Sequence, residues 1–110
     1  MTSPGLAALI AAWKRFDIAL WSHDGFDEAA FEELKSALEL CAREWAGQPS
    51  IPRVGANILV DIFPATESNA AACPGEQGRR ILDAALTLQN LVWKCVALDQ
   101  SAAGAAGNHT

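Results

Sequence analysis

The sequence contains no tyrosine and few charged residues, which make up 19% of its 110 positions. No stretch approaches the roughly 20 consecutive apolar residues of a transmembrane helix. No basic leader precedes the first apolar stretch, so we expect neither a membrane span nor a signal peptide. The net charge of −5 leaves the chain without the basic surface that binds phosphate backbones, so nucleic acid is not an expected partner.

Residues that bind metals or act as nucleophiles are also scarce. The three cysteines, Cys41, Cys73 and Cys95, are odd in number and lack the spacing of a metal site, which favours reduced thiols and a cytoplasmic protein. Neither histidine lies on a predicted helix, and no carboxylate has a histidine three or four residues away on a helix. We therefore expect no metal ion and no cofactor.

The composition favours helices packed into a single domain. Alanine, leucine and glutamate dominate, and all three have high helix propensity. The sequence predicts an all-α, four-helix, up-and-down bundle over residues 1–100, followed by a disordered tail over residues 101–110. Helices are expected at about 4–22, 27–46, 52–63 and 79–99, with a long loop over residues 65–78 between the third and the fourth.

Local signals mark where these helices begin and end. Asp27 is a typical N-cap residue, and Phe26 and Phe31 have the spacing of a hydrophobic staple. Gly47 is expected in the left-handed conformation that ends a helix, and Pro64 is expected to end the third helix.

The third segment admits two interpretations. The run Ile58–Phe63 is short and apolar, which fits either a helix or a buried strand. A lone strand would leave its backbone groups without partners, so we favour a helix. Because this helix is apolar nearly all round, we expect it to be the most enclosed of the four.

The last helix carries two apolar stripes. At 100° per residue, a broad stripe that includes Ile81, Leu88 and Cys95 faces a core. A second stripe, about a third of a turn away, needs cover from other helices, another subunit or a ligand. Its members are Leu82, Leu86, Gln89 and Trp93.

The second stripe and the lack of a catalytic cluster favour a non-enzymatic interaction protein. It would be a small adaptor, regulator or immunity-type inhibitor that self-associates through Leu82, Leu86, Gln89 and Trp93 or binds a protein partner. Residues 27–46 also carry six acidic and two basic residues, most of the net charge of −5. This segment is a second candidate surface for a basic partner, with Glu28, Glu32 and Glu39 as its exposed acids.

An alternative hypothesis is a small-molecule-binding bundle, which is either a binding protein or an enzyme. Asp17 falls inside the apolar stripe of the first helix, between Trp13 and Trp21, where a carboxylate loses water and its pKa rises. Asp61 lies beside the apolar face of the third helix. These four residues form a candidate ligand pocket, and Asp17 is its candidate acid or base.

Overall fold

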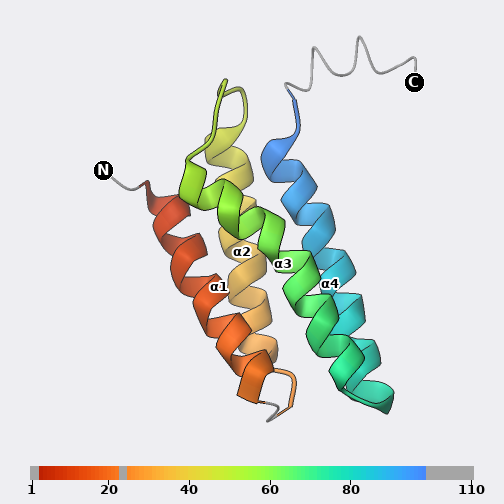
Figure 1. The fold of residues 1–110 in the computed structure, drawn as a ribbon. Coiled ribbons are helices and arrows are strands. Elements are labelled where there is room, and N and C mark those ends of the chain that lie inside the picture. The colour runs from red at the N-terminus through yellow and green to blue at the C-terminus, as the bar shows by residue number, and fades with distance from the viewer. Residues whose placement is uncertain (1–2, 23–24, 99–110) are drawn as a thin grey trace, which may run out of the picture.

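Four helices make up the computed structural model, which describes residues 3–22 and 25–98. They are α1 (Pro4–Ser22), α2 (Glu28–Trp45), α3 (Arg53–Ala72) and α4 (Gly75–Val96). The chain runs alternately down and up through them (Figure 1). The all-α, up-and-down architecture is therefore confirmed, and the third segment is a helix. The predicted tail over residues 101–110 lies outside the described residues.

The helix signals in the α1–α2 half of the sequence act as expected. The side chain of Asp27 accepts a hydrogen bond of 2.9 Å from the backbone N–H of Ala30, as an N-cap should. The rings of Phe26 and Phe31 lie 5.4 Å apart, so the hydrophobic staple is formed. Gly47 follows α2 with a φ of 77°, the left-handed conformation that ends many helices.

The long loop predicted between the third and fourth helices is wrong. Pro64 lies inside α3, which continues to Ala72, so only Cys73 and Pro74 separate α3 from α4. A proline inside a helix removes one backbone hydrogen bond. Thr66 and Ala70, beyond the proline, are buried against the bundle, and this packing favours continuation of the helix. Alanine-rich residues 65–72 also favour helix.

Gly78 makes the short connection between α3 and α4 sterically feasible. A Cβ atom at this position would lie 2.2 Å from the backbone oxygen of Cys73 and 2.9 Å from that of Ala70. Only a residue without a side chain fits so close to the end of α3. The start of α4 at Gly75 therefore lies four residues before the expected start at Arg79.

The helices pack in an order that differs from their order in the sequence. The hairpin partners α1 and α2 pack together, as do α3 and α4, and the two hairpins meet through α1–α3 and α2–α4 contacts. Among the four described helices, α2 and α3 are diagonal although they are consecutive. They approach each other at their ends, where a Cβ on Gly55 would lie 2.7 Å from the Trp45 ring.

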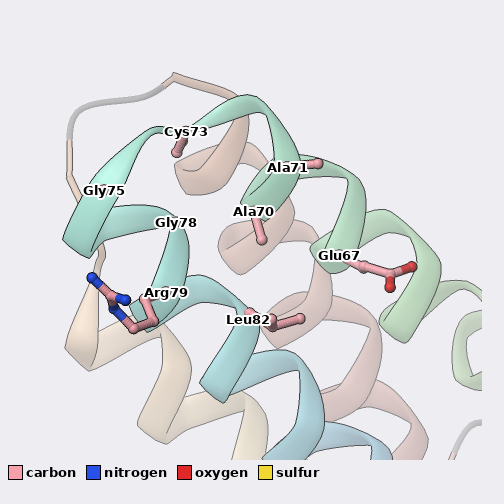
Figure 2. Close-up of a pocket in the computed structure, with 8 residues that line it drawn as sticks. All are labelled: Glu67, Ala70, Ala71, Cys73, Gly75, Gly78, Arg79 and Leu82. Atoms are coloured by element: carbon pink, nitrogen blue, oxygen red, sulfur yellow. The ribbon is translucent and has the colours of Figure 1, made fainter.

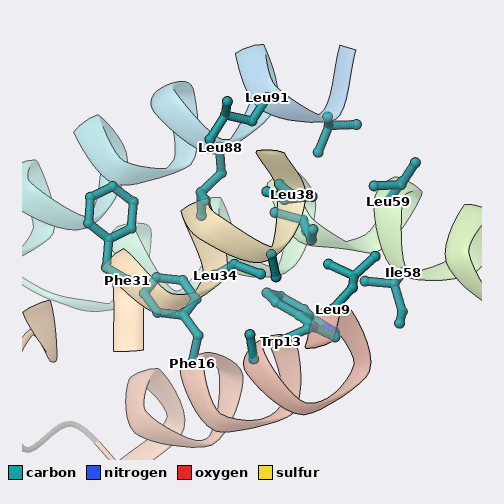
Figure 3. Packing of buried hydrophobic residues seen from close by; sticks show 14 of the residues in the cluster. Leu9, Trp13, Phe16, Phe31, Leu34, Leu38, Ile58, Leu59, Leu88 and Leu91 are labelled. Carbon is teal, nitrogen blue, oxygen red and sulfur yellow. The ribbon is translucent and has the colours of Figure 1, made fainter. Parts of the chain in front are cut away.

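The core lies between the two hairpins and draws on all four helices (Figure 3). Two exposed positions correct our expectations. Trp21, which the helical period places beside the apolar stripe of the first helix, is 74% exposed. Val60 on α3 is 72% exposed, so α3 is not fully enclosed. Each helix packs against two neighbours and keeps one side open. The largest fully buried apolar side chains are Leu9, Phe16, Leu34, Leu38, Ile62, Ile81 and Leu88.

Candidate protein-interaction surface

The two apolar stripes of α4 meet different environments. Leu88, on the inner stripe, is fully buried in the core. On the outer stripe, Leu82 is 39%, Leu86 52% and Trp93 60% exposed, and Gln89 is half-buried. The bundle covers the first stripe, while the second faces outward along the described length of α4.

Helix α3 extends this outer apolar surface. Val60, Phe63 and Pro64 line a pocket of about 430 Å³ together with Gln89 and Trp93. Sequence reasoning missed the α3 residues because it ended the helix at Pro64 and treated it as enclosed. A signal was present, since the lining residues of α3 follow the i, i+3, i+4, i+7 pattern of one helical face. They are Ala56, Leu59, Val60, Phe63, Pro64, Glu67, Ala70 and Ala71.

A second depression lies between α3 and α4, beside the connection that joins them (Figure 2). Its volume is about 500 Å³. Small residues leave this space open, and Leu82 joins it to the outer stripe of α4. We call it the small-residue hollow; it is lined by Glu67, Ala70, Ala71, Cys73, Gly75, Gly78, Arg79 and Leu82.

The two depressions and the outer stripe of α4 form one surface. Leu86 lies between Leu82, which lines the hollow, and Gln89, which lines the other pocket. An apolar centre with charged residues at its edge is the usual composition of a protein interface. We call this surface the α3–α4 face; it consists of Val60, Phe63, Pro64, Leu82, Leu86, Gln89, Trp93 and Val96 and the small-residue hollow.

The candidate acidic surface on α2 is partly engaged within the chain. Glu28 accepts hydrogen bonds of 3.1 and 2.9 Å from the guanidinium of Arg80, and these bonds raise the pKa of Arg80. The same guanidinium lies 4.4 Å from the centroid of the Phe26 ring. Glu32 pairs with Lys35 at 2.9 Å. Two of the three predicted acids thus hold intramolecular partners, and Glu39 is exposed.

The structure places the residues of the candidate ligand pocket in different environments. Trp13 is in the core, whereas Trp21 is exposed. Asp17 is half-buried, and its pKa is raised by desolvation and by the nearby carboxylate of Asp61. The two acids predicted as neighbours are therefore close enough to interact. The pockets on the α3–α4 face are lined by none of these four residues.

Replacing Asp17 with asparagine is expected to stabilise the fold at neutral pH. A folded-state pKa above the unfolded value means that ionisation costs the folded state free energy. This cost is absent below the unfolded pKa of 3.8 and complete above the folded pKa. Asp17→Asn should therefore raise the unfolding free energy at pH 7 by roughly 0.5 kcal/mol.

The advantage of Asp17→Asn should disappear near pH 3, where the wild-type carboxyl is protonated in both states. Urea unfolding across this pH range measures it, with Glu67→Gln, an exposed acid on α3, as the control. A variant as stable as the wild type at pH 7 would contradict the proposed repulsion between Asp17 and Asp61.

The thiols of Cys41 and Cys95 have low reactivity. Burial, with a smaller effect of Glu44, raises the pKa of Cys41 to about 11, and burial, with a smaller effect of Cys41, raises that of Cys95 to about 12. Both thiols therefore stay protonated at neutral pH, and neither supplies the thiolate that acts as a nucleophile.

Within residues 3–22 and 25–98, no three His, Cys, Asp or Glu side chains lie close enough to hold a metal ion. No helix of the same residues is long and apolar enough to cross a membrane.

Comparisons with models of protein families, with curated proteins and with solved structures find no match to this chain. What the α3–α4 face can do therefore follows from its own geometry. This face combines exposed large apolar side chains on two adjacent helices with two depressions between those helices.

Proposed function

We propose that this protein is a non-enzymatic interaction domain that self-associates through the α3–α4 face. Its class would be that of a small cytoplasmic adaptor, regulator or immunity-type inhibitor. The observation that carries the proposal is the exposure of Leu82, Leu86 and Trp93 in one line along α4. Contiguous apolar surface of this kind is typical of protein contact sites.

The arrangement of the face supports an interface more strongly than exposed apolar residues alone. Single exposed apolar side chains are common, and Ile18 and Trp21 on α1 are examples outside the face. On the α3–α4 face, by contrast, Trp93 and Val60 stand beside a pocket that a partner side chain can enter. Tryptophan is also enriched among the residues that contribute most binding energy at interfaces.

The test is the mass of the protein in solution. We expect sedimentation velocity to show a dimer that forms as the concentration rises through the micromolar range. Leu86→Glu should raise the dissociation constant by about 100-fold, because a carboxylate would be buried without a partner. Ile18→Glu places the same charge on an exposed isoleucine of α1 and should leave the constant unchanged. A wild-type monomer at every concentration would contradict self-association.

A further inference from the structure

The outward residues of α4 follow a heptad spacing. Successive members are separated alternately by three and four residues along the helix. This spacing keeps a row of side chains facing one partner helix over several turns, and it is the pattern of paired helices in coiled coils. The inner stripe already packs in the bundle, so α4 presents a second seam to the outside. The seam consists of Arg79, Leu82, Leu86, Gln89, Trp93 and Val96.

We infer that the occupant of this seam is α4 of a second copy, running antiparallel to the first around a two-fold axis. The inference rests on the proposed self-association and adds its geometry. The seam residues are spaced symmetrically about a point between Thr87 and Leu88. When the two antiparallel α4 helices cross at this point, every seam residue of one copy faces a seam residue of the other. In this register Leu82 faces Trp93 of the second copy, Leu86 faces Gln89, and Arg79 faces Val96.

The same register brings a large side chain to a hollow that lacks one. Leu82 lines the small-residue hollow, so Trp93 of the second copy lies at its mouth. The hollow has a volume of about 500 Å³, and four of its eight lining residues (Figure 2) are alanine or glycine, which leaves room for an indole ring. Two-fold symmetry makes the contact twice, since each chain carries one Trp93 and one hollow. This self-complementarity favours a second copy over a foreign helix.

Charge complementarity supports the antiparallel direction. Asp83 and Lys94 are exposed beside opposite ends of the seam, and the proposed register places Asp83 near Lys94 of the second copy. Arg79 falls beside the last turn of the other α4, where the helix dipole favours a cation. A parallel pair would instead bring each of these charges against its own copy, which is unfavourable.

Filling the hollow tests the inference. Ala71→Trp places a ring in the hollow of the same chain, and we expect it to exclude the second copy and raise the dimer dissociation constant at least about tenfold. Ala72→Trp is the matched control, because Ala72 is an exposed alanine next in sequence that does not line the hollow. Circular dichroism shows whether both variants fold. Equal dissociation constants for the two variants would overturn the assignment of the hollow.

A charge exchange tests the direction. Lys94→Asp should weaken the dimer about fivefold at low salt, and adding Asp83→Lys to the same chain should restore the wild-type constant. A double variant no tighter than the single one would overturn the antiparallel register. If Leu86→Glu dissociates the dimer while both tests fail, the geometry is wrong and the proposed function stands. A monomeric wild type would remove both.

Discussion

Replacing Leu88 with alanine is expected to lower the unfolding free energy by about 3 kcal/mol. Leu88 is fully buried on the inner stripe of α4, among side chains from the other helices (Figure 3). Removing most of the side chain from such a site loses the free energy of burial and leaves a cavity that neighbours fill incompletely. Denaturant unfolding at a protein concentration below the dissociation constant of the dimer measures this effect.

Leu86→Ala is the matched control for Leu88→Ala, because it makes the same change two residues away on the same helix. Leu86 is 52% exposed, so its loss should lower the unfolding free energy of the monomer by less than about 1 kcal/mol. The same change should weaken self-association. Similar losses of monomer stability from both substitutions would mean that α4 does not have one inner and one outer apolar face.

The substitution Gly78→Ala is expected to cost about 3 kcal/mol of unfolding free energy, although alanine normally favours helix. The new Cβ would meet the backbone oxygens of Ala70, in the last turn of α3, and of Cys73, the residue that follows α3. Backbone cannot move aside without displacing the α3–α4 connection. Thermal or denaturant unfolding of the variant measures the loss.

Gly55→Ala provides the comparison for Gly78→Ala. A Cβ on Gly55 would lie 2.7 Å from the far edge of the Trp45 ring, and a side chain can shift more cheaply than backbone. Alanine also gains about 1 kcal/mol of helix propensity over glycine. The loss at Gly55 should therefore be clearly smaller. A Gly78→Ala protein as stable as the wild type would show that the close approach does not constrain the hairpin.

Local signals predicted the α1–α2 half of the fold better than the α3–α4 half. Asp27, Phe26 and Phe31 act within a few residues of one another, so their roles can be deduced from sequence spacing. Pro64 and Gly78 depend on tertiary contacts. The burial of residues beyond Pro64 keeps α3 helical, and the packing of Gly78 on the end of α3 is a contact between helices. Neither effect is visible in local propensity.

The candidate site shows the same division. The helical period alone assigns Leu82 and Leu86 to a different stripe of α4 from Leu88, and the first two are exposed in the folded chain. Val60 belongs to the α3–α4 face because of which helices pack against α3. The helical period of the sequence does not specify which helices are neighbours. Trp21 shows the same limit, because the helical period places it beside the apolar stripe of α1, whereas in the folded chain it is 74% exposed.

The diagonal placement of α2 and α3 has a consequence for how the chain assembles. Each hairpin joins helices that are adjacent in sequence, so much of the native structure forms by closing short loops, which favours rapid folding. The connector over residues 46–52 joins the two hairpins and is exposed except at Ile51, which packs against the core. It is therefore the natural place in this chain to accept an inserted sequence, or a break between two separately synthesised polypeptides that reassociate.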